Sequence, residues 1–365
     1  MQAKIKEIIR GKVLNVYKEQ ILLYYKGAII LCDNTGKNPK VLDRLKWPQY
    51  CLAQIRVLER LLRLEPRMAF LNDNRREFIL SWNGKLININ KFNLEKKVLY
   101  VYREGMKNPL SINKIEKIPN FEDGYIFGDY FSNPFKECVA LYQIQKDQCK
   151  KIAILPAGTA LHIHGCIPDP YENRVLILTG DDDKESGIWS ATDNFKKIEP
   201  LLTGKQQYRA CVAFPTKEGI IFATDTPLES NAIYFYSNKE RTVKKIYDMP
   251  GPCIYGTQIK NKKDEIIYVL STSIEPDSSL SRWHYFITSK RGKGVKDNYS
   301  YLIVGNMERG FKQIKLCQKD IWPMALFQFG NIQFLSDSEN PNELYLYMLA
   351  VKQYDGKTIK YKIEI

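Results

Sequence analysis

Two of the three histidines in the chain stand two residues apart, at His162 and His164, and the acidic run Asp181-Asp182-Asp183 follows them. Alternate residues of an extended strand point to the same face, so the two imidazoles are expected to lie side by side. A single histidine is usually a satisfied core residue, whereas two on one face favour a functional pair. Imidazole and carboxylate groups act as general acids and bases, and both ligate metal ions. The pattern predicts a functional site around this pair.

A second pair of chemically useful residues has the same spacing from an aspartate. His164 lies 17 residues before Asp181, and Tyr208 lies 17 residues before Asp225. Equal spacing indicates equivalent positions in neighbouring structural repeats. A tyrosine or histidine that moves a proton, together with an arginine that neutralises a carboxylate, suits lyase-like elimination from an acidic sugar. The predicted catalytic residues are His162, His164, Tyr208 and Arg209.

The elements that must position these residues recur along the chain. The third strand of each unit is expected to end in a segment that combines basic residues with an isoleucine. These segments end at Ile152, Ile198, Ile246 and Ile314, with gaps of 46, 48 and 68 residues. An insertion at 278–298 enlarges the last gap. A period in the forties with about four short strands per unit is typical of a β-propeller blade.

The first run of this unit occurs seven times, which predicts an all-β, seven-bladed β-propeller formed as a single domain by residues 1–365. The seven runs are 21–25, 78–82, 124–130, 175–182, 219–226, 266–273 and 332–338. Six or eight blades, or an elongated β-solenoid, are the alternatives. The N- and C-terminal strands are expected to share one blade and to close the ring. Apolar residues at helical spacing predict one short amphipathic helix near 52–64, ended before Pro66.

In a propeller, the starts of first strands and the ends of second strands lie on one face. Further side chains are therefore expected beside the histidine pair, two of them on the 278–298 insertion. The predicted substrate-binding residues are Asp129, Tyr130, Asp181, Asp182, Asp225, Tyr255, Trp283 and His284. The recurring aspartate also has a structural explanation, because an aspartate at a strand end can accept hydrogen bonds from the next turn.

The segment TGDDDKESGIWSATDNFKKI, residues 179–198, resembles the turn of the Asp-box (BNR) propellers, which reads S-x-D-x-G-x-x-W between the third and fourth strands. Asn194 and Phe195 stand where a glycine is expected, and Ile198 replaces the tryptophan. Residues 120–275 are also similar to uncharacterised bacterial proteins of this sialidase-superfamily-like class, some associated with surface-polysaccharide loci. The resemblance implies a propeller fold and a carbohydrate-active or glycan-binding role. The arginine motif usual in sialidases, F/Y-R-I-P, is absent.

The chain carries 55 Lys and Arg against 41 Asp and Glu, a net charge of +14. A positive field suits an anionic partner. The predicted function is recognition or processing of an anionic sugar or polysaccharide, and the alternative is a non-catalytic propeller that binds a glycan or a protein. An enzyme would be a polysaccharide lyase or a glycoside-hydrolase-like enzyme, the latter with Asp129, Asp181 and Asp182 as candidate paired carboxylates. Nucleic acid is not favoured, because no recognition motif accompanies the charge. No cofactor is predicted, although a divalent cation near His162 and His164 stays open.

The eight cysteines occur singly and without the spacing of zinc ligands. The first residues form no apolar signal segment, and no apolar run reaches the roughly 18 residues of a membrane span. These features predict thiols without disulfides in a reducing cytoplasm, and no membrane span.

Overall fold

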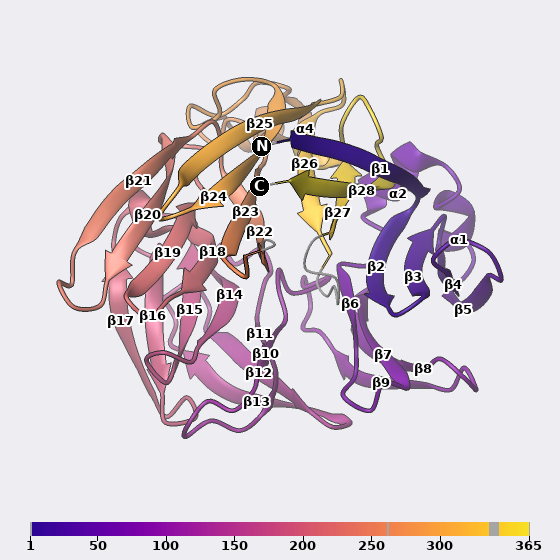
Figure 1. Ribbon diagram of the computed structural model, residues 1–365, viewed down its shortest axis with the longest axis horizontal. Coiled ribbons are helices and arrows are strands. Elements are labelled where there is room, and N and C mark those ends of the chain that lie inside the picture. Colours follow the sequence, from indigo (N-terminus) through magenta and orange to yellow (C-terminus); the bar gives the residue numbers. More distant parts are fainter. Residues whose placement is uncertain (1, 261–262, 336–342, 365) are drawn as a thin grey trace. The chain divides into compact units, whose positions relative to one another are not determined.

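The computed structural model describes residues 2–260, 263–335 and 343–364. Their strands pair into seven antiparallel sheets of four strands each (Figure 1). Short runs rich in β-branched and aromatic residues, separated by tight turns, favour such strands. The chain has the fold of a seven-bladed β-propeller, so the predicted fold class and blade number are confirmed.

The chain divides into two compact units. The first comprises residues 1–83, 87–97 and 255–365, and the second comprises 84–86 and 98–254. The division passes through the strands β8, β9 and β22.

The second unit holds three complete sheets. Their strands are β10 (Asn113–Ile115), β11 (Gly124–Gly128), β12 (Val139–Gln145) and β13 (Gln148–Leu155), then β14 (His162–Asp169), β15 (Arg174–Gly180), β16 (Gly187–Thr192) and β17 (Lys197–Thr203), then β18 (Ala210–Pro215), β19 (Gly219–Thr224), β20 (Asn231–Ser237) and β21 (Val243–Met249). A short 3-10 helix, Gln206–Tyr208, leads into β18.

The remaining four sheets belong mainly to the first unit. Their strands are β2 (Lys12–Tyr17), β3 (Gln20–Tyr25), β4 (Ala28–Asp33) and β5 (Lys40–Arg44), β6 (Met68–Leu71), β7 (Glu77–Trp82), β8 (Lys85–Asn90) and β9 (Lys96–Val101), β22 (Cys253–Lys260), β23 (Ile266–Thr272), β24 (Tyr299–Asn306) and β25 (Gly310–Gln318), and β26 (Asn331–Phe334), β27 (Glu343–Leu349), β28 (Lys357–Glu364) and β1 (Gln2–Arg10).

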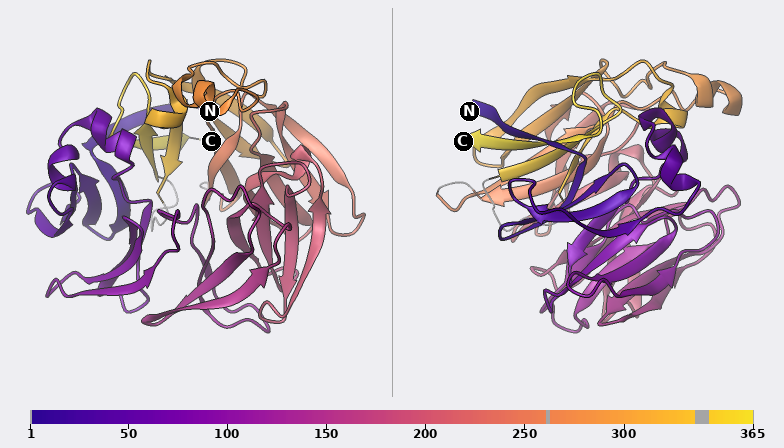
Figure 2. Two further views of the ribbon diagram at one scale, coloured as in Figure 1. Left: turned by 180° about the vertical axis from the view of Figure 1, so that it is seen from behind. Right: turned by 90° about the vertical axis from the view of Figure 1, so that its right-hand side faces the viewer.

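The two ends of the chain lie side by side in one sheet, because β1 pairs antiparallel with β28 (Figures 1 and 2). Six of the seven runs used to count blades are second strands of their sheets. The seventh differs, since residues 332–334 lie in the first strand β26, and its residues after 335 lie outside the described part of the chain. The segments ending at Ile152, Ile198, Ile246 and Ile314 all fall in fourth strands.

A short helix, α2 (Arg56–Leu62), lies within the range 52–64 where one was predicted, and a second short helix, α1 (Gln49–Leu52), precedes it beside the sheet β2–β5 (Figure 2). Ile55 adopts an extended conformation between them, and Arg63 ends α2 in the left-handed region. The residues that α2 buries are Glu59 and Arg60. Both form ion pairs, Glu59 with Arg56 and Arg60 with Asp320. The other helices, α3 (Arg282–Ile287) and α4 (Met324–Phe327), are also short.

In the second unit, neighbouring sheets pack through apolar side chains. One cluster joins the sheets β10–β13 and β14–β17 through residues such as Ile126, Leu141, Ile163 and Ile177. Another joins β14–β17 to β18–β21 through Leu178 and Phe222. These interfaces hold the starts of β14 and β18 beside each other. Within the described residues no helix combines the length and apolar character of a membrane span, and the cysteines form no disulfide.

Candidate functional site

The histidine pair begins β14, the first strand of its sheet. The Nε2 atoms of His162 and His164 are 3.0 Å apart, and the ring centroids are 4.9 Å apart. The pairing of β14 with β15 shifts register between Ile163 and Gly165, so His164 sits at a β-bulge. Bulges re-aim a side chain relative to the regular pleat and are frequent beside active sites.

His164 is almost fully buried, with 2 % of its surface exposed. Its Nδ1 lies 3.0 Å from the carbonyl oxygen of Ala210. A carbonyl oxygen only accepts hydrogen bonds, so Nδ1 carries the proton and donates. In neutral His164 the other nitrogen, Nε2, therefore presents a lone pair toward His162 and Asp181.

Asp181 follows β15 and faces both imidazoles. Its Oδ2 is 3.5 Å from His162 Nε2, and its Oδ1 is 3.4 Å from His164 Nε2. Arg209 Nη2 lies 3.0 Å from Oδ1. Burial alone would raise the pKa of the Asp181 carboxyl, but Arg209 and His162 outweigh it and hold that pKa well below its usual range. The group is an anion with 37 % of its side chain exposed.

The three groups form a donor set for a metal ion. One nitrogen from each histidine and a carboxylate oxygen of Asp181 lie within 4.8 Å of one another. The donors of a four-coordinate ion with bonds of about 2.0–2.1 Å lie roughly 3.3 Å apart. The separations of 3.0, 3.4 and 3.5 Å are close to that spacing. Two imidazoles and a carboxylate suit divalent ions of the first transition series and zinc.

The backbone beside Asp181 is held by a second layer of polar groups. Its carbonyl oxygen accepts hydrogen bonds from Gln206 Nε2 at 2.8 Å and from Arg209 Nη1 at 3.1 Å. Gln206 is buried and in turn accepts a hydrogen bond from the Thr226 hydroxyl at 2.6 Å. These contacts fix the Asp181 carboxylate against the histidine pair.

Asp225, at the end of β19, continues the cluster into the interior. Its Oδ2 accepts a hydrogen bond from Cys211 Sγ at 3.0 Å and lies 3.9 Å from Arg209 Nη2. Burial and the adjacent carboxylate raise the pKa of the Cys211 thiol well above its usual value. Cys211 is therefore a protonated donor. His164, Cys211 and Asp225 form a second, fully buried group of possible metal-ligating atoms.

Tyr130 and Asp129 follow β11 but face different surroundings. The Tyr130 ring meets the His162 ring edge-on at 4.6 Å, so it belongs to the wall of the site. Asp129 is buried, and its Oδ2 accepts the Ala140 N–H at 2.9 Å, as expected of a strand-end aspartate that satisfies backbone donors. Burial raises its pKa despite that hydrogen bond and the nearby Arg103.

Two other predicted residues of the second unit make contacts outside the donor set. Tyr208 packs against the apolar cluster that contains Leu178 and Phe222. Asp182 is exposed, and its carbonyl oxygen accepts the Ser186 N–H and hydroxyl, both at 2.8 Å, in the turn before β16.

The last three predicted residues belong to the first unit. Arg67 stacks on the Tyr255 ring at 5.1 Å. Trp283 and His284 lie on α3, where Trp283 is 71 % exposed and the Ser281 hydroxyl lies 2.7 Å from His284 Nδ1.

Sequence reasoning missed Gln206 and Cys211. Cys211 sits at a register shift in β18, between Ala210 and Val212, as His164 does in β14. Both residues therefore occupy equivalent bulged positions at the start of a first strand. A bulge has no regular sequence motif, so the sequence did not reveal that Cys211 is the counterpart of His164. Gln206 gave no signal of its own.

Comparison with solved structures finds proteins of similar fold, whereas the two sequence comparisons find no match. No protein-family model matches the chain, and no curated protein matches it. Among solved structures, an oligogalacturonate lyase from Vibrio parahaemolyticus is similar, with a TM-score of 0.56, 12 % identity, and 98 % of this chain and 92 % of that chain covered.

Two further structures are similar over the same length. The AfRom2 CNH domain has a TM-score of 0.56, 6 % identity, and 100 % and 99 % coverage. The extracellular domain of a putative hybrid two-component system from B. thetaiotaomicron has a TM-score of 0.53, 10 % identity, and 98 % and 39 % coverage. At these identities the likeness shows the shared fold, and a fold does not define a function.

Proposed function

We propose that His162, His164 and Asp181 bind a divalent metal ion and that this ion, with Arg209, holds the carboxylate of an acidic sugar. The observation that carries the proposal is the convergence of two imidazole nitrogens and an ionised carboxylate at 3.0–3.5 Å. His164 Nε2 lies 3.0 Å from His162 Nε2 and 3.4 Å from the Asp181 carboxylate, so one cation placed between them would meet all three groups. A divalent ion would bind the two imidazole nitrogens and the carboxylate together.

An acidic sugar is supported by the charge of the molecule and of the site. The chain has a net charge of +14, and Arg209 places a guanidinium beside the predicted ion. Arginine matches carboxylate geometry through its planar fork. A protein of similar fold is named as an oligogalacturonate lyase, which is consistent with this class of substrate.

The enzymatic form of the proposal is a lyase-like elimination. Neutralising the uronate carboxylate makes the neighbouring C5–H more acidic, and a base removes that proton. The electron pair forms the C4–C5 double bond as the C4–O glycosidic bond breaks, and the leaving oxygen takes a proton from solvent. Because the metal would occupy the histidine nitrogens, we place the base at Tyr130, whose ring lies 4.6 Å from His162. We give Tyr208 no catalytic role here, since its ring packs against an apolar cluster.

Metal titration by calorimetry tests the site. Mn²⁺ and Zn²⁺ should bind the unmodified protein at one site, and His162→Ala and His164→Ala should each weaken that binding at least about tenfold. His284→Ala is the matched control, because it changes the third histidine, which lies on α3. Both site variants must first be shown to be folded. Unchanged metal affinity in both would then show that the two histidines do not bind the metal ion.

Turnover separates the enzyme from the non-catalytic alternative. With oligogalacturonate as probe, an eliminating enzyme produces an unsaturated uronate that absorbs in the ultraviolet. Tyr130→Phe should abolish that product while oligogalacturonate still binds. Binding without product by the metal-loaded, unmodified protein would instead assign a glycan-binding role.

A further inference from the structure

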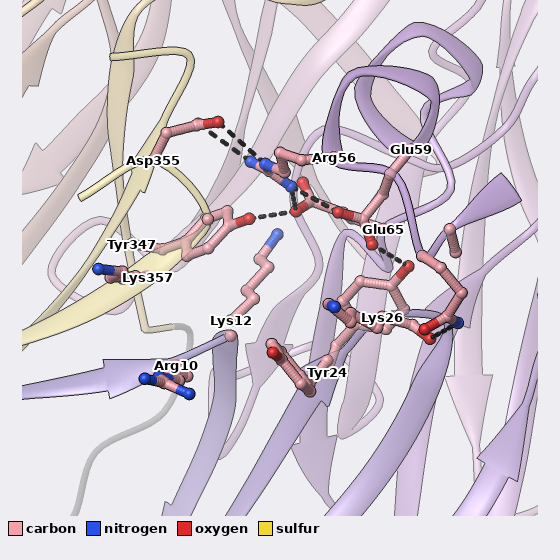
Figure 3. A pocket seen from close by; sticks show the side chains of 15 residues that line it. Arg10, Lys12, Tyr24, Lys26, Arg56, Glu59, Glu65, Tyr347, Asp355 and Lys357 are labelled. Carbon is pink, nitrogen blue, oxygen red and sulfur yellow. Dashed lines mark hydrogen bonds and ion pairs between the residues drawn. The ribbon is translucent and has the colours of Figure 1, made fainter. Parts of the chain in front are cut away.

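A separate cavity of about 340 Å³ lies in the first unit, where the two ends of the chain meet (Figure 3). Its wall is formed by the junction of β1 and β2, the end of β3, helix α2, and the turn that leads into β28. Pockets of roughly 300–1,000 Å³ accommodate small-molecule ligands. None of the residues around His162 takes part in it.

The floor of the cavity is organised around Arg56. Its guanidinium donates to both oxygens of Asp355 at 3.0 and 3.1 Å. It also reaches Glu59 at 2.8 Å and Glu65 at 2.5 Å. One arginine thus holds three carboxylates in place (Figure 3). These groups keep further acceptor positions, because each carboxyl oxygen that accepts one hydrogen bond still has a second lone pair.

Neighbouring side chains make this floor rigid. The Tyr24 hydroxyl donates to Glu59 at 2.7 Å, and the Tyr347 hydroxyl donates to Glu65. Lys12 donates to the carbonyl oxygens of Pro66 and Arg67, at 2.9 and 3.0 Å. A binding surface whose groups are already oriented loses little entropy when a ligand arrives.

Two glycines let the backbone line the cavity. Gly11 and Gly356 have φ values of +104° and +74°, which disfavour residues with a side chain. A Cβ on Gly11 would lie 2.5 Å from the carbonyl oxygen of Tyr24, and one on Gly356 would lie 3.0 Å from Arg56 Nε. The hydrogen bond from Gly11 N–H to the Gly356 carbonyl oxygen, at 3.1 Å, joins the two chain ends there.

The mouth carries the opposite charge from the carboxylates of the floor. Arg10, Lys26 and Lys357 line it and are exposed (Figure 3). Among the described residues none of the three forms an ion pair with a carboxylate, so their charges face solvent at the rim. An anionic group entering the mouth would meet three cations, whereas hydroxyl groups deeper in the cavity would meet acceptors.

We propose that this cavity binds a small anionic carbohydrate, a sugar phosphate or a sugar acid, with its hydroxyls on the carboxylate floor and its anionic group at the basic rim. A metal ion suits the cavity less well, because Arg56 already engages all three carboxylates. The proposal is independent of the function proposed for the histidine site, since the two sites share no residue.

Calorimetry on the full chain tests the cavity with four probes: glucose 6-phosphate, glucuronate, glucose and inorganic phosphate. The protein is first treated with EDTA, so that the histidine site holds no metal ion to bind a sugar carboxylate. The first two probes test the two sources of negative charge, and at least one of them should bind at a single site. Glucose and inorganic phosphate should each bind at least about tenfold more weakly, because glucose lacks the anionic group and inorganic phosphate lacks the sugar hydroxyls.

Variants then locate the binding. The double variant Arg10→Gln with Lys357→Gln should weaken binding of the anionic sugar at least about tenfold. Lys352→Gln is the matched control, since Lys352 is an exposed lysine of the same terminal segment that does not line the cavity. His164→Ala should leave this binding unchanged.

Three results would overturn the inference. They are the absence of binding by both anionic sugars, equal affinity for inorganic phosphate alone, and loss of anionic-sugar binding in His164→Ala but not in the double variant. The last result would assign the sugar to the histidine site, so failure of this proposal is distinguishable from failure of the other. The exposed rim variants are expected to fold, and unchanged thermal unfolding checks this.

Discussion

The position of the His164 imidazole depends on a residue without a side chain, Gly180. A Cβ at Gly180 would lie 2.6 Å from His164 Cε1 and 3.2 Å from Arg209 Cγ. The donor set can assemble because β15 ends in a glycine at this point.

The three aspartates that follow second strands have different roles because their neighbours differ. Asp129 accepts a hydrogen bond from a backbone N–H, Asp225 accepts one from a thiol, and Asp181 faces two imidazoles.

Gly180→Ala should therefore displace His164, weaken metal binding at least about tenfold, and lower the free energy of unfolding by about 1–3 kcal/mol. Urea denaturation and metal calorimetry measure the two effects. The control is a double-mutant cycle with His164→Ala, because removing the imidazole removes the clash. Additive stability effects would show that the two residues do not contact each other.

Lys12 makes stability depend on pH. Burial lowers the pKa of its ammonium from 10.5 to about 7 in the folded protein. Between those values the unfolded chain binds the proton and the folded chain does not, so this group raises stability as pH rises from about 7 to 10.5, by up to roughly 1.4 kcal/mol per pH unit.

Lys12→Met should flatten that slope. The free energy of unfolding, measured by urea denaturation at pH 7, 8 and 9, should rise less steeply with pH in the variant than in the unmodified protein. Lys352→Gln, at an exposed position, should keep the original slope. Parallel profiles for Lys12→Met and the unmodified protein would contradict the prediction.

At the scale of elements, α2 is the clearest departure from its sequence pattern. The leucines at helical spacing predict an apolar buried face, yet Leu61 and Leu62 are each 37 % exposed. The buried residues are Glu59 and Arg60. Arg60 donates to Asp320 at 2.5 Å and to the Phe327 carbonyl oxygen at 2.9 Å, both far along the chain. Hydrophobic periodicity reports a local preference and cannot reveal a long-range ion pair.

Arg60→Ala should lower the free energy of unfolding by about 3–5 kcal/mol, because it leaves the Asp320 carboxylate without this partner in a largely buried setting. Leu61→Ala, the neighbouring change on the exposed face, should cost less than about 1 kcal/mol. Urea denaturation of both variants measures the difference. The opposite order would restore the apolar interpretation of α2.

At the scale of the whole molecule, the blade count and the four-strand unit were predictable from sequence. The repeat is carried by strand-length apolar runs and turn residues, and both are local properties that backbone geometry imposes on every copy. The starting strand was placed one strand too late in six of the seven units, since the runs easiest to recognise there are second strands. The ends of the chain meet in one sheet through the pairing of β1 with β28.

Deleting residues 2–10 should remove one edge of that sheet and expose the backbone of β28. The free energy of unfolding should fall by roughly 3 kcal/mol or more, since each lost backbone hydrogen bond contributes about 0.5–1.5 kcal/mol, and the exposed edge should promote self-association. Urea denaturation and light scattering measure both effects. Lys4→Gln keeps the backbone pairing and should change neither. A truncated chain that stays equally stable and monomeric would show that β1 is dispensable.

The sequence by itself determined the all-β class, the seven blades and the pairing of His162 with His164, because each depends on spacing within a strand or on a period along the chain. The propeller pattern also predicted that Asp181 and Arg209 share a site with that pair, whereas tertiary structure alone decided the atomic contacts and added Gln206 and Cys211. Asp181, Arg209 and Cys211 come from different strands and join it through packed sheets and bulged registers. The same holds for the Arg56 cavity, whose Asp355 is 299 residues away along the chain. Contacts of this kind depend on which sheets pack together, and local sequence patterns do not encode that information.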